Sequence, residues 1–185
     1  MKSVIRSLEK RDKKMAEWTE HECKIAQRTA DMALLFALRA HDVECVRYAL
    51  DALGADVRTQ VSRYQPPMHS AIAYLRPGVS SDVAAVSSCL KLLIDHGAPV
   101  DERNADMTTP LTVALDHSSV PVVELLLDHA ASICGIDGDG LNAIEYLAGQ
   151  RNPDKQLVEF LRDRYQTLFL EWWAGAGGPS LAGLI

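Results

Sequence analysis

The stretch that decides the fold is Met107-Thr-Thr-Pro-Leu-Thr-Val-Ala-Leu-Asp116, followed by Val122-Val-Glu-Leu-Leu-Leu-Asp-His-Ala-Ala131. Thr109-Pro110 is typical of a helix start, because a threonine oxygen can accept a hydrogen bond from a free amide and the fixed φ of proline suits the first turn. In the second segment, apolar residues occupy most of the circumference of a helix. Ala114 is small where a second helix must approach closely. The two segments therefore predict a packed pair of helices.

Related segments precede and follow this pair at about the length of one helix pair. The preceding copy contains Pro67-Met-His-Ser-Ala-Ile72 and Leu90-Lys-Leu-Leu-Ile-Asp-His-Gly-Ala-Pro-Val100. Gly97 is expected to end the helix of that copy, because glycine accepts the left-handed conformation after the last turn. A lone pair could not bury these apolar faces, whereas each pair in a stack covers the next. The pattern predicts a row of stacked repeats.

The pattern resembles the ankyrin repeat, D-x-x-G-x-T-P-L-H-x-A followed by a turn and V-V-x-L-L-L-x-x-G-A. Four copies in register cover residues 30–164, and the first is degenerate. The resemblance implies an all-α, ankyrin-like helical-repeat solenoid with short hairpin loops. The departures from the pattern are Met107 for the tip glycine, Asn142-Ala143 for Thr-Pro, and Ala33 for the proline of the first copy. The expected repeats are approximately 29–61, 62–100, 101–133 and 134–164.

Residues 1–28 are expected to form a helical extension ahead of the repeat domain, 29–164. A stripe at alternating three- and four-residue steps contains the apolar residues Val4, Leu8, Met15, Trp18 and Ile25, with Arg11 and Glu22 at the two remaining positions. Such a stripe either caps the exposed end of the first repeat or makes a coiled-coil contact with a partner or a second copy.

Residues 165–185 are expected to extend the last helix, as far as 173, and then to form an apolar tail broken by glycine and proline. The tail is too short and too rich in helix breakers to span a bilayer. Three interpretations remain open: folding back over the last repeat, docking a partner through Trp172 and Trp173 as aromatic anchors, or contact with a membrane surface.

The second repeat carries an insertion at residues 75–88, about ten residues longer than the usual turn. Pro77-Gly78 is expected to break the first helix, and Ser80 or Ser81 with Asp82 to cap a lengthened second one. We expect longer helices here rather than a loop. The insertion is either tolerated by the stack or forms the wall of a ligand pocket.

The charge of the chain argues against nucleic acid as a partner. The formal net charge is −6, and binding to nucleic acid depends on neutralising phosphates. Residues 1–28 carry eight Lys and Arg against five Asp and Glu, a net +3, and the remainder carries 11 against 20, a net −9. An acidic body predicts a basic patch or basic peptide as partner.

The cysteines and the N-terminal residues indicate an intracellular protein, cytoplasmic or nuclear. Cys23, Cys45, Cys89 and Cys134 have no C-x-x-C spacing and are expected to be reduced thiols. No apolar central region of a signal peptide interrupts the charged residues near the N-terminus.

The resemblance places binding residues on the hairpin tips and the inner helix of each repeat, which form a concave surface. No metal and no cofactor are expected, because the histidines lack the spacing of a metal site. The segment Asp137-Gly-Asp-Gly140 lacks the later ligands of a calcium loop and is expected to form a tight turn. His69 is expected to have a structural, hydrogen-bonding role. The predicted partner-binding residues are Arg39, Tyr74, Arg103, Asp106, Thr108, Asp116, His117, Asp139, Tyr146, Trp172 and Trp173; Phe36, Ser70, Ala73, Ala105, Val113, Ile136, Gly138, Leu141 and Gln150 share the same surface.

The sequence thus predicts non-catalytic recognition of another protein, on the concave face. The common phosphate-loop, nucleophile-elbow and zinc-protease motifs are absent. One alternative is a small enzyme or accessory protein in which Asp116, His117 and Tyr74 act in a pocket walled by the insertion. Another is a self-associating scaffold, a homo-oligomer joined through the N-terminal helix or the C-terminal tail.

Overall fold

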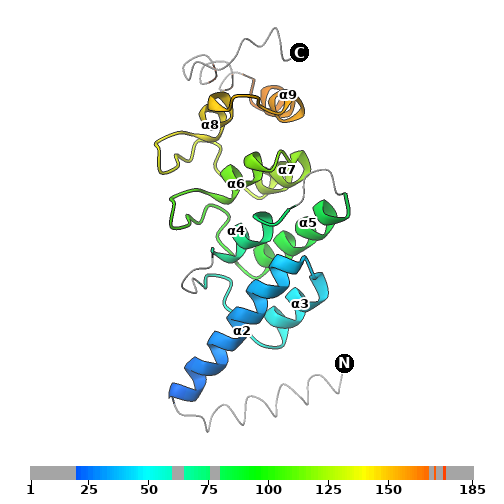
Figure 1. Cartoon of the computed structure of the whole chain (residues 1–185), viewed down its shortest axis with the longest axis vertical. Helices are drawn as coiled ribbons and strands as arrows, with labels where there is room; N and C mark the ends of the chain where they lie inside the picture. Colours follow the sequence, from blue (N-terminus) through cyan, green and yellow to red (C-terminus); the bar gives the residue numbers. More distant parts are fainter. Residues whose placement is uncertain (1–19, 60–64, 76–79, 167–168, 170–172, 174–185) are drawn as a thin grey trace.

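The helices form two layers that run along the length of the molecule (Figure 1). The computed structural model describes residues 20–59, 65–75, 80–166, 169 and 173. The inner layer holds α2 (Glu20–Ala40), α4 (Pro67–Ile72), α6 (Pro110–Asp116) and α8 (Ala143–Gly149), and the outer layer α3 (Val43–Asp51), α5 (Ser80–Asp95), α7 (Val120–Asp128) and α9 (Lys155–Arg164). In the described part of the chain no β-strand occurs; α2, α4 and α6 contact α3, α5 and α7 within their pairs, and successive helices of each layer contact one another. The all-α repeat solenoid is therefore confirmed.

The helix starts follow from local side-chain chemistry. The hydroxyl of Thr109 accepts a hydrogen bond from the amide of Thr112, and Pro110 occupies the first turn of α6, as the sequence predicts. Helix α8 has Asn142-Ala143 in place of Thr-Pro, and a capping box stabilises its start instead. The Asn142 side chain accepts from the amide of Glu145, and the carboxylate of Glu145 accepts from the amide of Asn142.

The turn between the inner and outer helices repeats its geometry. His41 after α2 and Ser118 after α6 both have positive φ, 54° and 50°. Their amides donate hydrogen bonds to the carbonyl oxygens of Leu38 and Leu115, each three residues earlier. Matching turns at corresponding positions show that the degenerate first copy keeps the register of the third.

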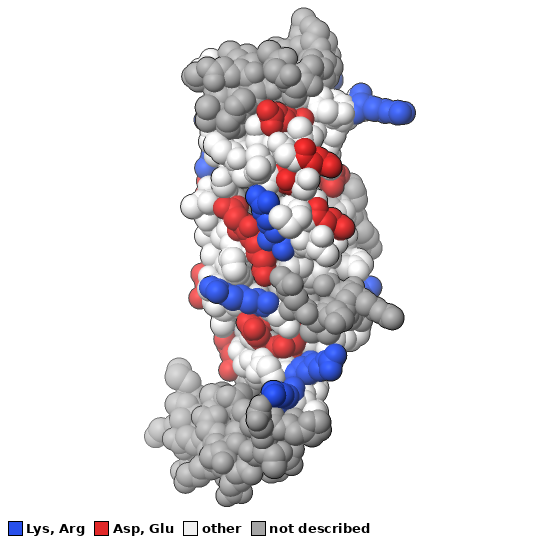
Figure 2. All heavy atoms as spheres, turned by 90° about the vertical axis from the view of Figure 1, so that its left-hand side faces the viewer, with Lys and Arg blue, Asp and Glu red and all other residues white. Residues whose placement is uncertain are grey.

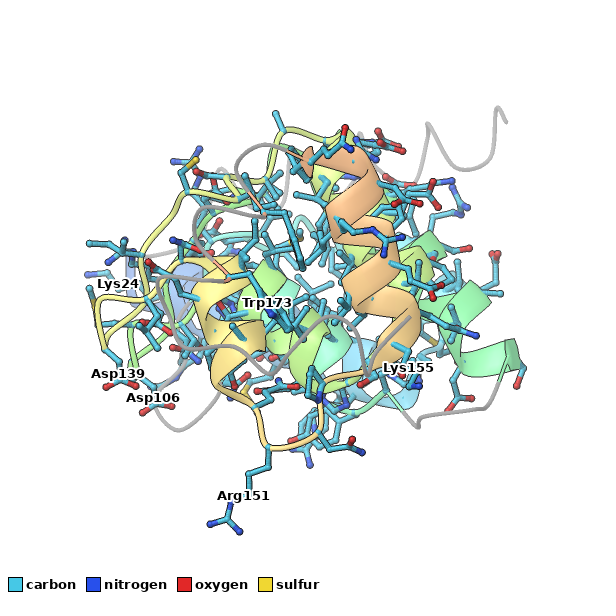
Figure 3. All side chains as sticks on the ribbon, turned by 90° about the horizontal axis from the view of Figure 1, so that it is seen from above. Lys24, Asp106, Asp139, Arg151, Lys155 and Trp173 are labelled. Atoms are coloured by element: carbon cyan, nitrogen blue, oxygen red, sulfur yellow. The ribbon has the colours of Figure 1, made fainter. Side chains whose placement is uncertain are left out.

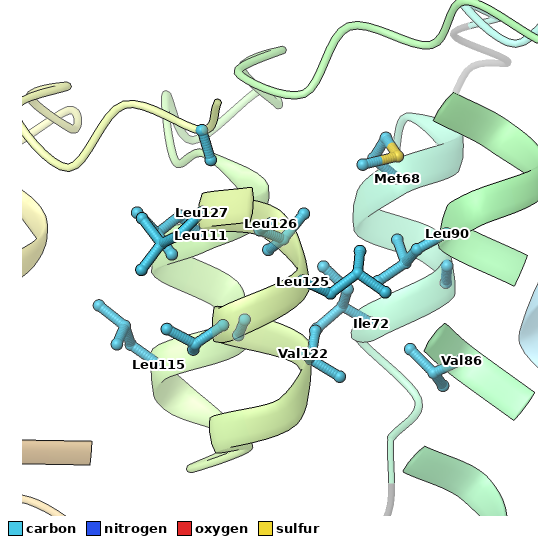
Figure 4. Close-up of a cluster of buried hydrophobic side chains, with 14 of the residues drawn as sticks. Met68, Ile72, Val86, Leu90, Leu111, Leu115, Val122, Leu125, Leu126 and Leu127 are labelled. Atoms are coloured by element: carbon cyan, nitrogen blue, oxygen red, sulfur yellow. The ribbon is translucent and has the colours of Figure 1, made fainter. Parts of the chain in front are cut away.

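The core is a continuous seam of aliphatic side chains between the layers (Figure 4). Met68 and Ile72 of α4 pack with Leu90 of α5, and the next pair repeats the arrangement with Leu111 of α6 and Leu126 of α7. All five side chains are buried. Removing one of the leucines is expected to cost about 2–5 kcal/mol, because the neighbouring repeats cannot close over the cavity.

Two segments differ in extent from the sequence-based expectations. Helix α2 runs without a break from the extension into the first repeat, so the expected boundary at residue 28 lies inside it. Ala33 stands there in place of the helix-starting proline of the second and third repeats, Pro67 and Pro110, so no proline interrupts the helix. Helix α5 is lengthened as predicted, at 16 residues, whereas α4 is short, at 6 residues. The N-terminal stripe from Val4 to Trp18 lies outside the described residues.

The C-terminal end of the last repeat is closed by aromatic side chains. Helix α9 ends at Arg164, where Tyr165 leaves the helical conformation, so the predicted extension to residue 173 is broken at this point; Gln166, Phe169 and Trp173 are again helical, and the amide of Phe169 donates to the carbonyl of Tyr165. Phe169 is fully buried, and its ring stacks on Trp173 at a centroid distance of 5.0 Å. In Figure 3 Trp173 lies over the middle of this end of the stack.

This burial corrects the prediction that Trp173 is a docking anchor. The side chain is 3% exposed and therefore does not present a free ring to a partner; the tail that follows it, residues 174–185, lies outside the described residues. Trp172 lies outside the described residues. Within the described part of the chain, no helix has the length and apolar character needed to cross a membrane.

Candidate interaction surface

The hairpins of the third and fourth repeats are fixed by the same side-chain clamp. Oδ1 of Asn104 accepts hydrogen bonds from the amides of Asp106 and Thr108, both 3.0 Å long. One repeat later, Oδ1 of Asp137 accepts from the amides of Asp139 and Leu141, both 2.9 Å long. Each clamp satisfies two amides that a loop would otherwise leave to water. The predicted tight turn at 137–140 is confirmed.

The two hairpin tips touch each other. A Cβ added to Gly138 would lie 2.8 Å from the carbonyl oxygen of Asp106 and 3.2 Å from Cβ of Met107. Only a residue without a side chain lets the tips approach this closely. The tips are therefore one continuous ridge rather than separate loops.

Met107 occupies the position at which the repeat pattern has glycine, and it keeps the glycine conformation. Its φ is 60°, against 79° for Gly140 at the equivalent position of the next repeat. The left-handed region costs a residue with a side chain about 1–2 kcal/mol. The Met107 side chain is nevertheless exposed, as are those of Ile136 and Leu141 on the adjoining hairpin.

On the inner helices, Tyr146 of α8 donates a hydrogen bond to Oδ1 of Asp116 on α6, at 2.5 Å. Partial burial of the phenol raises the pKa of Tyr146, and its hydrogen bond to Asp116 and the negative charges of Asp116, Asp137 and Asp139 raise that pKa further. Three carboxylates from two repeats thus lie around one half-buried phenol.

A second aromatic contact lies nearer the N-terminal end of the stack. The guanidinium of Arg39 on α2 lies 4.5 Å from the ring centre of Tyr74, which follows α4. The structure thus brings together two predicted binding residues from adjacent repeats. Tyr74 remains exposed on the same layer as Tyr146.

Figure 2 shows this face of the molecule, with acidic side chains gathered over its middle and upper parts and basic ones between and below them. Asp106, Asp116 and Asp139 are all exposed. In the view along the stack, Asp106 and Asp139 project from the same side (Figure 3). Asp106, Asp116 and Asp139 belong to the third and fourth repeats, whereas Arg39 belongs to α2 of the first repeat.

Two residues of the catalytic alternative, Asp116 and Tyr74, have side chains that are engaged elsewhere. The carboxylate of Asp116 accepts from Tyr146, Tyr74 contacts Arg39, and the amide of His117 caps the end of α6. No hydrogen bond joins Asp116, His117 and Tyr74 within the described part of the chain. Two surface grooves, of about 550 and 320 Å³, are lined by Ser118 with residues 152–156 and by residues of α5 and α7, and neither includes the three.

Ser70 was expected on the binding surface, and this expectation is wrong. Its side chain is buried, and its hydroxyl donates to the carbonyl of Gln65 at 2.9 Å, which holds the chain that enters α4. The other predicted hairpin residues Arg103 and Thr108 are half-buried.

His69 joins the second repeat to the third. Its Nε2 donates to the carbonyl oxygen of Thr108 at 2.9 Å, whereas Nδ1 is buried without a hydrogen-bond partner. In the third repeat, Thr112 stands at the corresponding position and its hydroxyl bonds to that of Thr109. The second repeat has Pro66 in place of that threonine, so Nδ1 finds no hydroxyl. Burial lowers the pKa of His69.

The described residues contain no group of three or more His, Cys, Asp or Glu side chains arranged to hold a metal ion. What the surface offers is carboxylates, exposed apolar side chains and aromatic rings on a rigid frame. These groups suit contact with another macromolecule through charge and shape.

A family model described as ankyrin repeats (many copies) matches residues 86–127. The chain is similar to neurogenic locus notch homolog protein 2 of Homo sapiens and of Mus musculus, with 30% identity over 132 residues in each case. It is also similar to neurogenic locus notch homolog protein 1 of Xenopus laevis, with 29% identity over 132 residues. Each match covers 71% of this chain and 5% of the relative, so the chain spans a small part of the length of these relatives.

Proposed function

Because this chain carries ankyrin repeats, whose general role is to bind other proteins, we propose that it is a non-catalytic recognition module that binds a basic protein segment on its concave face. The observation that carries this proposal is that Asp106, Asp116 and Asp139 are exposed on the inner helix and hairpins of adjacent repeats, where acidic side chains gather on one face (Figure 2). Carboxylates on a rigid frame attract a cationic partner and select against an anionic one.

The geometry supports binding rather than turnover. Asp116 is held by the phenol of Tyr146, which is protonated at neutral pH as an ordinary tyrosine is and donates the hydrogen bond. The hydrogen bond therefore fixes the orientation of the Asp116 carboxylate. A fixed charge of this kind can accept a hydrogen bond or an ion pair from Lys or Arg of a partner.

The test uses a fluorescent oligolysine peptide, with oligoglutamate as the opposite-charge probe, and measures anisotropy at low and physiological salt. We expect oligolysine alone to bind, with an affinity that falls as salt rises. Asp116→Asn and Asp139→Asn should each weaken binding about two- to fivefold at low salt.

The matched control is Glu159→Gln, which removes the same charge from an exposed position on α9 of the outer layer. It should leave the affinity for oligolysine within experimental error of the wild type. Equal losses in all three variants would mean that only net charge matters, and the concave face would then not be the binding surface.

We also assign this function to the interior of the cell. Cys45, Cys89 and Cys134 are free thiols, and Cys89 is buried in the seam between repeats. Free thiols suit a reducing compartment. Fractionation of cells that produce the chain should recover it with cytoplasmic or nuclear proteins, and recovery from the medium would contradict the assignment.

A further inference from the structure

Three apolar side chains stand exposed on the ridge formed by the two touching hairpin tips. Met107 is 46% exposed, Ile136 52% and Leu141 37%. We call these three residues the apolar crest. Met107 belongs to the third repeat, and Ile136 and Leu141 belong to the fourth. The two hairpins touch where Gly138 lies directly against Asp106 and Met107.

The crest is held rigidly. The clamps of Asn104 and Asp137 fix the backbone on either side of each tip, and Gly138 keeps the tips in contact. An exposed apolar surface that is ordered before binding loses little conformational entropy when a partner covers it. It is therefore suited to docking.

Met107 is costly to the folded chain where it stands. Its left-handed backbone is unfavourable for a residue with a side chain. Because the thioether side chain is largely exposed, its partial burial offsets only part of that cost. Glycine meets the same geometry at Gly140 without strain. Of the four non-glycine residues with positive φ in the described part of the chain, Met107 alone has a long apolar side chain, and that side chain is exposed, which is what a docking site for a partner requires.

The charges beside the crest define what that partner carries. The hairpins 101–109 and 134–142 contain five carboxylates, Asp101, Glu102, Asp106, Asp137 and Asp139, and one cation, Arg103. Asp106 precedes Met107 in the chain, Asp139 lies two residues before Leu141, and both carboxylates are exposed. An apolar segment with acidic neighbours would be repelled here, and one with basic neighbours would be attracted.

We propose that the apolar crest binds an extended peptide segment of another protein in which a leucine or methionine is flanked by Lys or Arg. This proposal rests on the proposed function and adds an apolar anchor to it. The anchor packs on Met107, Ile136 and Leu141, and the flanking cations lie near Asp106 and Asp139.

The experiment is a titration of the isotope-labelled full chain with short synthetic peptides, followed by amide chemical shifts. The central sequence is Lys-Leu-Lys in the test peptide, Lys-Ser-Lys in the first comparison and Glu-Leu-Glu in the second. We expect Lys-Leu-Lys to bind at least about fivefold more tightly than either comparison, with the largest shifts at Met107, Gly138 and Leu141.

The decisive variant is Met107→Gly, which removes the side chain and relieves the backbone. Its affinity for the Lys-Leu-Lys peptide should fall about five- to tenfold, while its resistance to urea should not fall below that of the wild type. Tyr48→Ser removes an exposed ring from α3 of the outer layer and should leave the affinity unchanged.

Failure of the crest and failure of the proposed function give different results. Binding of Lys-Leu-Lys and Lys-Ser-Lys with equal affinity, or an unchanged affinity in Met107→Gly with shifts at Asp116 and Tyr146, overturns the crest and leaves the acidic concave face standing. Absence of binding by both the Lys-Leu-Lys peptide and oligolysine overturns both proposals.

Discussion

The phenol of Tyr146 on α8 and the carboxylate of Asp116 on α6 are joined by a hydrogen bond of 2.5 Å that links the fourth repeat to the third. Their helices contact each other only along the inner layer, so the bond ties two repeats together at the binding surface. The same bond fixes the direction of a carboxylate that the proposed function uses. Stability and recognition are thus coupled at this pair.

Replacing Tyr146 with phenylalanine should lower the free energy of unfolding by about 0.5–1.5 kcal/mol, the usual value of one hydrogen bond. The ring remains in place, so packing is kept and the loss should concentrate in the fourth repeat. Urea denaturation measures the first effect, and amide hydrogen exchange in α8 and α9 the second. Equal exchange in both proteins would contradict the role of the bond.

The same variant has a signature in pH dependence. The pKa of Tyr146 in the folded chain lies above its ordinary value of 10.0, so the folded state favours the protonated phenol. Its stabilising contribution is complete below pH 10 and is lost as pH rises through the folded pKa. The decline in stability above pH 10 should be shallower in Tyr146→Phe than in the wild type, with Tyr48→Phe as the exposed control.

His69 should make the fold sensitive to acid. Burial lowers its pKa below the ordinary value of 6.5, so the folded state favours the neutral ring. The sign is opposite to that of Tyr146: the contribution is complete above pH 6.5 and is lost as pH falls, at up to about 1.4 kcal/mol per pH unit. Urea denaturation at pH 7.5 and 5.5, before and after His69→Gln, should show a smaller pH effect in the variant.

His129→Gln provides the control, because His129 is exposed and bonds only within its own helix end. Its stability should vary with pH as that of the wild type does. Imidazole resonances supply an independent measurement should His69→Gln fold poorly. If the ring of His69 protonates at or above pH 6.5, the explanation by burial is wrong.

Gly138 and Gly149 form a matched pair for the contact between hairpin tips. Alanine at 138 would place its Cβ 2.8 Å from the Asp106 oxygen, whereas alanine at 149 has nothing within 4 Å. We expect Gly138→Ala to lose about 1–3 kcal/mol and Gly149→Ala to change by less than about 1 kcal/mol, in the stabilising direction at the end of α8. Thermal and urea unfolding would measure both, and equal values would show that the tips are not in firm contact.

Much of the fold could be predicted because it depends on local chemistry. Thr109-Pro110 starts α6, Gly97 follows the end of α5, and the turn at 137–140 forms, all through interactions of residues close in sequence. Asn142 with Glu145 carried an equally local signal, the capping box, which sequence reasoning missed.

Contacts between repeats were less predictable. The bond from Tyr146 to Asp116 spans thirty residues, and the contact of Arg39 with Tyr74 joins two repeats separated by a hairpin. Such pairs depend on side-chain directions across a packed interface, which periodicity does not specify. The prediction for Trp173 failed for the same reason. An indole ring suits an exposed anchor as well as a buried cap, and the side chain is buried because it stacks on Phe169.

The ends of the outer helices offer a reciprocal pair of substitutions. Gly97 after α5 has a φ of 82°, and Ala130, at the same position after α7, has a φ of 64°. Both residues therefore end a helix in the left-handed conformation, but only glycine does so without cost. Ala130→Gly should raise the free energy of unfolding by about 0.5–1 kcal/mol, and Gly97→Ala should lower it by about 1 kcal/mol. A Cβ at Gly97 meets nothing within 4 Å, so the loss of stability in Gly97→Ala would come from the backbone alone.

Urea denaturation of both variants and of the double variant measures the two effects, which should add because they lie in different repeats. A higher free energy of unfolding in Gly97→Ala would show that the effect of the substitution on the unfolded chain outweighs the backbone strain at the helix end.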